Sequence, residues 1–193
     1  MAIAENRLFL PLLNYETYMA EEEIFSRYEI IDGKRIFMPG ATELHQDIVL
    51  TIGSLFKIFA IVHGGKAVIA PRDVLISRNP LKTRQPDVML FSSHRHSLNG
   101  DRSSKAPYIA APELVVEILS DSDRANVLNA KLVDYQKAEV SECWIVDIAQ
   151  KTVEVLKLNK VEATSFRIFA YSETVQSVVF PELEVSVAEI FAE

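Results

Sequence analysis

The chain has 193 residues, of which 49% are hydrophobic, which is enough for one sizeable domain and too little to argue for two. A formal net charge of −7 argues against a protein that coats nucleic acid by bulk attraction, although it leaves room for a local basic cleft. One cysteine, Cys143, excludes an intramolecular disulfide and a multi-cysteine zinc site. From the length we expect a single domain over residues 1–193.

The first residues, MAIAENRLFLPLLNYETYM, lack a basic region followed by a long apolar run. No run of about twenty apolar residues occurs elsewhere in the chain. We therefore expect no membrane span and a cytoplasmic protein.

Two helices and two strands are predicted in the N-terminal third. Residues 14–26 are typical of a short acidic helix, and Asp32-Gly33 is a hairpin turn signal between two short strands. Residues 43–62 are predicted to form a helix because apolar residues recur at steps of three and four. These apolar positions are Leu44, Ile48, Ile52, Leu55, Phe59 and Val62.

The rest of the chain predicts mainly strands. After the His63-Gly64-Gly65 break, one helix is expected over residues 123–138, following a cluster of capping residues. A polar loop is expected over residues 92–107. The predicted strands are 66–76, 87–91, 113–119, 143–147, 152–158 and 165–171. The fold class is therefore α/β (α+β), with a mixed central sheet flanked by helices.

Glu117 breaks the apolar run APELVVEILS at residues 111–120. A central buried strand should be apolar throughout, and a buried carboxylate is costly unless it is paired, hydrogen-bonded or bound to a metal. Alternation along the strand places Glu117 and Leu119 on one face and Ile118 on the other. Glu117 therefore requires a partner from elsewhere in the chain.

Asp87 opens a short apolar strand that should lie near residues 113–119 in the same sheet. Taken alone, it could be a solvated residue at a strand start. If it meets Glu117, however, the two carboxylates repel unless a cation lies between them, and oxygen ligands suit Mg²⁺ or Mn²⁺ better than zinc.

Lys131 interrupts an apolar stripe on the predicted helix. The stripe is formed by Val127, Leu128, Leu132 and Tyr135. A lysine in that position either extends its ammonium outward over the core or directs it at a buried anion. Glu117 is the candidate anion.

Several motifs in order then resemble the Uma-two-type family, which is described as putative restriction endonucleases and belongs to the PD-(D/E)XK nuclease superfamily. The motifs are YEIIDG, His45 at a helix start, QPDVMLF, APELVVEILSDSD, KLVDY from Lys131, VSECWIVD and the closing VVFPELEVSVAEIF. The resemblance covers nearly the whole chain. One departure is that Leu119 stands where the superfamily signature has a lysine, and Lys131 takes that place from the following helix.

The resemblance implies a restriction-endonuclease-like core in which Asp87, Glu117 and the Ile118 carbonyl bind Mg²⁺ or Mn²⁺. It implies hydrolysis of phosphodiester bonds in nucleic acid, with DNA as the expected substrate. Lys131 would orient the attacking water or stabilise developing charge. Glu29 resembles the upstream acid of the family, although it could instead be an exposed residue before a hairpin. His45 is a candidate substrate contact, or a structural histidine at the edge of its helix.

Two further features are expected to lie outside the site. Glu113 has the parity of Glu117 but lies roughly 13 Å away along the strand, at about 3.3 Å per residue. The polar loop is locally basic and could contact phosphates, but charged loops are usually only solvated. The residues that make it basic are His94, Arg95, His96, Arg102 and Lys105.

Two other classes of function stay open. One is a catalytically silent module with the nuclease fold that binds nucleic acid or a protein partner. The other is a structural or regulatory subunit whose buried charges pair with each other. A homodimer is expected, since many duplex nucleases pair two active sites about a two-fold axis. Removing Asp87 or Glu117 is expected to leave metal-free stability unchanged or higher.

Overall fold

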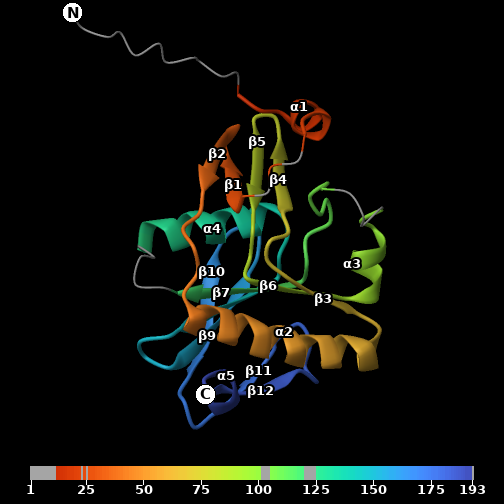
Figure 1. The fold of residues 1–193 in the computed structure, drawn as a ribbon. Coiled ribbons are helices and arrows are strands. Elements are labelled where there is room, and N and C mark those ends of the chain that lie inside the picture. The colour runs from red at the N-terminus through yellow and green to blue at the C-terminus, as the bar shows by residue number, and fades with distance from the viewer. Residues whose placement is uncertain (1–11, 23, 25, 101–104, 120–124, 193) are drawn as a thin grey trace, which may run out of the picture.

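The computed structural model describes residues 12–22, 24, 26–100, 105–119 and 125–192. Its centre is a six-stranded sheet with the order β10-β9-β8-β7-β6-β3 (Figure 1). The pair β7–β8 is parallel, and the other neighbours are antiparallel. The strands are β3 (Lys66–Ile69), β6 (Val88–Phe91), β7 (Leu114–Leu119), β8 (Glu142–Asp147), β9 (Thr152–Leu158) and β10 (Ala163–Phe169).

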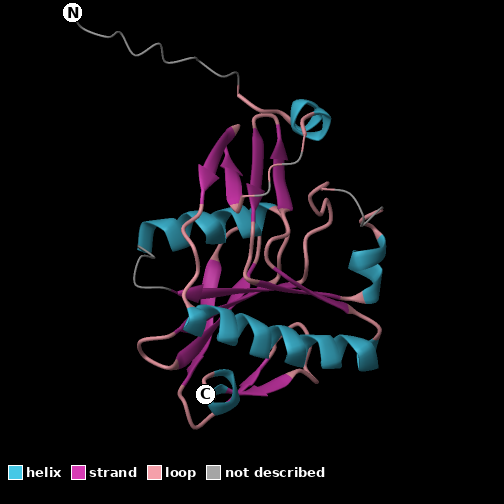
Figure 2. Cartoon of the chain, viewed as in Figure 1, coloured by secondary structure: helices cyan, strands magenta, loops and turns pink. Residues whose placement is uncertain are grey.

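Helices α2 (Glu43–His63) and α4 (Ala125–Lys137) lie on opposite faces of this sheet (Figures 1 and 2). Helix α4 is the crossover that a parallel β7–β8 pair requires. On the α2 side the core also includes residues from three short elements. These are β11 (Thr174–Gln176), β12 (Glu184–Ser186) and α5 (Val187–Ile190).

Two hairpins extend from the α4 side of the sheet, at the top of the view in Figure 1. They are β1 (Tyr28–Ile31) with β2 (Lys34–Phe37), and β4 (Val74–Arg78) with β5 (Leu81–Arg84). Asp32 and Gly33 both have positive φ at the first turn, as a two-residue hairpin requires. The hairpins and α1 (Tyr15–Ala20) share a small core that includes Tyr18, Ile30 and Leu81.

The mixed sheet with flanking helices confirms the predicted fold class. Four details of the prediction are wrong. The expected strand 66–76 is two strands, β3 and β4, in different sheets. The described part of the first helix ends at Ala20. The expected loop 92–107 contains a short helix, α3 (Ser93–Ser97). Elements β5, β11, β12 and α5 were not predicted.

Helix α2 ends one residue later than predicted, and its buried face differs from the predicted stripe. Leu44 and Val62 are exposed, whereas Val49, Phe56 and Ala60 are buried. Among the described residues, α2 alone is long and apolar enough to cross a membrane, judged by length and composition only. One of its faces packs in the core, and core helices satisfy the same criterion.

Candidate active site

Glu117 is buried in the middle of β7 and faces helix α4. Val116 and Ile118 pack in the core on the α2 side, so alternation turns Glu117 toward the opposite face. There Lys131 Nζ donates to Glu117 Oε2 at 2.6 Å, and the Tyr135 hydroxyl donates to Oε1. The prediction that Lys131 directs its ammonium at Glu117 is therefore confirmed as a contact. Lys131 is itself only 9% exposed.

Asp87 lies directly before β6, and its carboxylate accepts from three directions. Oδ2 accepts from the Ile118 N–H at 2.9 Å and lies 3.3 Å from His45 Nε2, while Oδ1 lies 3.1 Å from Arg27. Burial opposes the charge, but the hydrogen bonds from His45 and Ile118 hold the pKa of Asp87 below its ordinary value. The ionised form of Asp87 is thus stabilised, and its carboxylate bonds the peptide N–H that directly follows Glu117.

The two carboxylates have opposite electrostatic settings. Burial raises the pKa of Glu117 to about 7 against the attraction of Lys131, and the negative charge of Asp87 adds to the rise. Although burial disfavours the ammonium, the carboxylates of Glu117 and Glu29 raise the pKa of Lys131, so this side chain stays charged. The site therefore holds the charged Lys131 ammonium beside two carboxyl groups. The ionised form is favoured at Asp87 and disfavoured at Glu117.

Glu29 is buried inside β1, so the alternative that it is an exposed residue before the hairpin is wrong. Its Oε2 accepts from Arg84 at 2.7 Å, and its Oε1 accepts from the Gln85 N–H at 3.0 Å. Arg84 also donates to Asp134 of α4 at 2.8 Å. Glu29 is near enough to act electrostatically on Lys131, but its oxygens are held by β5 and the segment that leads to Asp87.

Glu113 binds elsewhere, at the other end of β7. It accepts from the Ser92 N–H at 2.9 Å and from the Ser92 hydroxyl at 2.6 Å. Arg95 donates to the backbone carbonyls of Ala111 and Glu139, which gives it a structural role. Of the other residues in the predicted basic loop, His94 and His96 belong to α3, Lys105 lines a cavity described below, and Arg102 lies outside the described residues.

The donor set at this site fits a hard divalent cation. Among the residues that the structure describes, no three His, Cys, Asp or Glu side chains lie close enough together to hold a metal ion. A cation here would therefore need Asp87, Glu117 and a backbone carbonyl. The described pairing of β6 with β7 begins with Val88 opposite Val116. Ile118 therefore lies on β7 beyond the start of β6, and the Asp87 carboxylate already accepts a hydrogen bond from the Ile118 N–H. All three donors are oxygens, as Mg²⁺ prefers.

Sequence reasoning missed Arg27, Tyr135 and Arg84 as parts of this region. Tyr135 was on the recognised stripe four residues after Lys131, so helical spacing could have assigned it to Glu117. Arg27 and Arg84 bind carboxylates 60 and 55 residues away in the chain, and no local pattern reports such pairs.

Comparisons with known proteins give the family and the fold of the chain. The Uma2 family, described as "Putative restriction endonuclease", matches residues 15–188. A solved structure described as "a putative nuclease belonging to DUF820 from Anabaena variabilis ATCC 29413" has a similar fold, with a TM-score of 0.74 and 19% sequence identity. The match covers 93% of this chain and 98% of that chain. No curated protein sequence matches the chain.

Proposed function

The chain belongs to the Uma2 family of putative restriction endonucleases, and on that premise we propose that it is a metal-dependent endonuclease that hydrolyses phosphodiester bonds of DNA. The observation that carries the proposal is the buried cluster of Asp87, Glu117 and Lys131. These three side chains come from two neighbouring strands and the helix that follows them. A buried ion pair is weak evidence for stability, and buried ionisable groups with shifted pKa values gather at functional sites, so this cluster is the candidate site.

In this proposal Asp87, Glu117 and the Ile118 carbonyl hold Mg²⁺ or Mn²⁺. When bound, the cation supplies charge neutralisation at the scissile phosphate and a bound water of lowered pKa. Lys131 orients the attacking water and stabilises the negative charge that develops on the phosphate oxygens. Its raised pKa keeps the ammonium charged for that role.

The surrounding residues position this machinery. His45 and Arg27 donate to Asp87 and fix the direction of its carboxylate. His45 Nδ1 is buried and has no hydrogen-bond partner within the described residues, so a substrate contact through this atom stays a prediction. Glu29 orients Arg84 and the Gln85 backbone and adds negative potential around Lys131, which makes it a positioning residue.

A second candidate is a silent module with the same fold that binds nucleic acid or a protein partner. It is favoured by one observation, that Lys131 and Tyr135 already satisfy both oxygens of Glu117. A related alternative is a structural subunit in which these charges serve only each other.

Two measurements separate these functions. Calorimetric titration with Mg²⁺ and Mn²⁺ should show binding to the wild-type chain and none to Asp87→Ala if the site holds metal. A cleavage screen over duplex DNA, single-stranded DNA and RNA should then show activity that Asp87→Ala lacks. Metal binding without cleavage would favour the silent module, and no metal binding would favour the structural subunit.

The remaining expectations extend the proposal. We further propose that the chain acts on nucleic acid in the cytoplasm and forms a homodimer that pairs two sites. Helix α2 presents exposed apolar side chains that a second copy could cover, namely Leu50, Ile58, Ile61 and Val62. Sedimentation velocity of the full chain tests the dimer, and a monomer at all concentrations would contradict it.

A further inference from the structure

Arg27 is more exposed than the other basic side chains that contact the two carboxylates of the candidate site. Its side chain is 27% exposed, against 9% for His45 and 11% for Lys131. The side chain of Asp87, which Arg27 contacts, is only 6% exposed. A phosphate that approaches Asp87 from the solvent on this side therefore meets Arg27 first.

Arg27 contacts the oxygen of Asp87 that has capacity for a further ligand. Asp87 Oδ2 accepts from the Ile118 N–H at 2.9 Å and lies 3.3 Å from His45 Nε2, so both of its lone pairs are engaged. Asp87 Oδ1 accepts from Arg27 at 3.1 Å and has no second hydrogen-bond partner within the described residues. A divalent cation held by Asp87 is therefore expected at Oδ1, beside the guanidinium.

The cation and the guanidinium would compete for this oxygen. Like charges a few ångströms apart repel, and the repulsion is doubled when one of them is divalent. The present position of Arg27 is also costly, because its Nε is buried and makes no hydrogen bond within the described residues. The contact between Arg27 and Asp87 is thus one that cation binding is expected to break.

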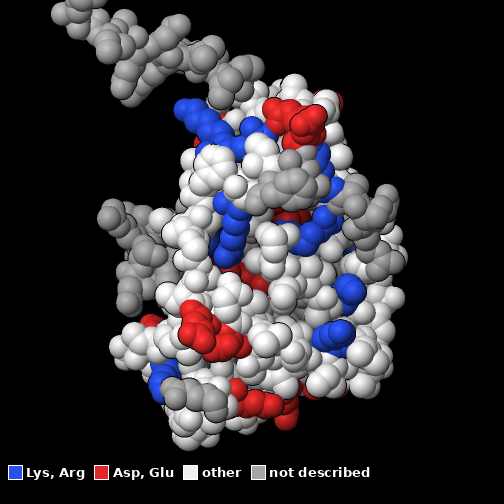
Figure 3. Space-filling view, in the orientation of Figure 1, with Lys and Arg blue, Asp and Glu red and all other residues white. Residues whose placement is uncertain are grey.

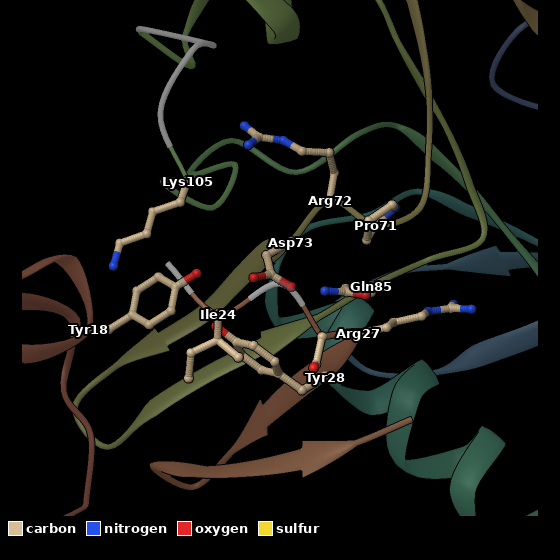
Figure 4. A pocket seen from close by; sticks show the side chains of 10 residues that line it. Tyr18, Ile24, Arg27, Tyr28, Pro71, Arg72, Asp73, Gln85 and Lys105 are labelled. Atoms are coloured by element: carbon tan, nitrogen blue, oxygen red, sulfur yellow. The ribbon is translucent and has the colours of Figure 1, made fainter. Parts of the chain in front are cut away.

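A cavity of about 250 Å³ lies beside Arg27, between the β1 and β4–β5 hairpins and the segment around Lys105. Arg27, Arg72 and Lys105 all line it, although they are far apart in the sequence (Figure 4). Figure 4 shows the Arg27 side chain leading away from the cavity, with its guanidinium turned from Lys105. Rotation about the side-chain bonds of Arg27 therefore moves the guanidinium between Asp87 and this cavity.

The accessible charge in the lining of the cavity is positive. Arg27, Arg72 and Lys105 are half-buried, whereas the acid in the lining, Asp73, is buried. In Figure 3, basic side chains lie on both sides of a hollow with acidic atoms at its floor. Arginine binds phosphate through two parallel hydrogen bonds, so a nucleic-acid backbone suits this surface.

We propose that Arg27 is a switch between the candidate metal site and the substrate. In the metal-free chain it pairs with Asp87 Oδ1, and a divalent cation at Oδ1 releases it to bind a backbone phosphate of nucleic acid at the mouth of the cavity. The positive charges of Arg72 and Lys105 extend the same surface. The inference rests on the proposed function in taking a cation and nucleic acid as ligands, and it adds that this arginine engages the substrate only once the cation is bound.

The first test measures the competition at Asp87 by calorimetric titration of the full chain with Mn²⁺, without nucleic acid. Arg27→Met, checked for folding by circular dichroism, should bind the cation about tenfold more tightly than the wild type, because a like charge beside the cation is removed. The control is Arg167→Met, which removes an arginine paired with Glu173 on the edge strand β10, and it should keep the wild-type affinity. An arginine that only holds Asp87 in place predicts weaker cation binding by Arg27→Met. Equal or weaker binding would overturn the switch.

The second test measures the phosphate contact in EDTA, where no cleavage contributes to the signal. Asp87→Ala removes the partner of Arg27 and should free the guanidinium as the cation does. The probe is a short fluorescent DNA duplex, titrated by anisotropy at several salt concentrations. The slope of log affinity against log salt should be smaller in magnitude by about 0.9 in Asp87→Ala/Arg27→Met than in Asp87→Ala, the value for one phosphate contact. With Asp87 present, Arg27→Met should leave the slope unchanged, since Asp87 already holds the arginine.

The outcomes separate the switch from the proposed function. Equal slopes in the two Asp87→Ala proteins, or no DNA binding by Asp87→Ala at low salt, would overturn the phosphate contact. An equal loss of slope with and without Asp87 would show phosphate binding that needs no release, which also overturns the switch. Cation binding by the wild type without an effect of Arg27→Met would overturn the switch alone, whereas no cation binding by the wild type would overturn the proposed function as well.

Discussion

Lys131 is the residue at which a catalytic and a purely structural reading differ most in their consequences. Its Nζ lies 2.6 Å from Glu117 and is buried, so it can act both on a reacting phosphate and on the pairing of Glu117. The sequence left two alternatives for this ammonium, extension outward over the core or contact with a buried anion, and Glu117 was the candidate anion.

Lys131→Met should reduce single-turnover cleavage by about 10²-fold or more, because it removes a donor that acts on developing charge while keeping stem volume and helix propensity. Calorimetric metal binding should persist, since Lys131 is not a metal ligand in this account. Lys137→Met, an exposed lysine on the same helix, is the control and should cleave at the wild-type rate. Equal rates from the two variants would remove Lys131 from the mechanism.

The contacts of the two carboxylates predict different effects on stability. From the sequence, removal of either one is expected to be neutral or stabilising. The structure changes this for Asp87, whose lowered pKa means that its carboxylate contributes stability at all pH values above its ordinary pKa. In EDTA at about pH 8, Asp87→Asn should therefore cost about 1–3 kcal/mol of unfolding free energy.

Glu117→Gln should have a smaller effect or a stabilising one under the same conditions. Its raised pKa means that the ionised form is disfavoured in the fold, and Asp87 and Glu29 still act on Lys131 after the change. Denaturant unfolding of both variants provides the comparison. A larger loss for Glu117→Gln than for Asp87→Asn would identify Glu117 as a structural ion-pair partner.

Asp73 should make stability depend on pH. Burial raises its pKa from 3.8 to about 6, so between these values the folded chain binds more protons at this group than the unfolded chain. Its contribution to stability therefore falls as pH rises through that window and is constant above it. As pH rises through that window, the unfolding free energy of the wild type should fall by roughly 2–3 kcal/mol relative to that of Asp73→Asn. Parallel pH dependences of the two melting curves would show that Asp73 does not titrate in this way.

Among the helices and strands, the turn between α2 and β3 packs against β6, the strand that begins directly after Asp87. Gly65 donates to Ala60 O at 2.8 Å, and the next residue, Lys66, pairs with Phe91 at the far end of β6. A Cβ at Gly65 would lie 2.4 Å from the Phe91 carbonyl oxygen, closer than any ordinary contact. Close packing of this turn against β6 therefore requires glycine.

Gly65→Ala should cost about 1–3 kcal/mol, because a backbone carbonyl of β6 or the turn itself must move. Gly40→Ala, where a Cβ would meet no atom within 4 Å, should change stability by less than about 0.5 kcal/mol. Urea unfolding measures both variants. A Gly65→Ala protein as stable as Gly40→Ala would show that this turn can relax freely.

The elements that the sequence predicted well are those with a strong local pattern. Strands β7 and β8 are nearly continuous apolar runs, and α2 and α4 have helical periodicity over many residues. Strand β5, with the sequence LKTR, has no such pattern because Arg84 is buried through its pairs with Glu29 and Asp134. Residues 66–76 read as one strand since their apolar content continues through the segment where the chain leaves one sheet for another.

The same reason explains what could be predicted of the site. Asp87 and Glu117 stand out because each interrupts or opens an apolar strand, and Lys131 because it interrupts an apolar stripe. Asp73 and Gln85 are buried and Arg27 is half-buried, yet all three lie in short polar segments, where such a residue has the same sequence signature as a solvated one. Their positions follow from how the hairpins pack beside the sheet, which only the fold reveals.

At the scale of the whole molecule, the candidate site lies where three parts meet. The sheet supplies Asp87 and Glu117, α4 supplies Lys131, and the β1–β2 hairpin supplies Glu29. The chain is acidic overall, with a net charge of −7, yet basic side chains line the adjoining cavity. Local basic surface of this kind suits a nuclease that contacts a few phosphates and does not coat its substrate.

We propose that this buried cluster cleaves nucleic acid with a divalent cation held by Asp87 and Glu117. The most direct test is the initial rate of DNA cleavage by the full chain in Mg²⁺, in Mn²⁺ and in EDTA, beside Asp87→Ala purified in the same way. We expect cleavage by the wild-type chain that requires the cation and is absent from the folded variant. Equal rates from the two proteins, or no cleavage by wild type despite measured metal binding, would contradict it.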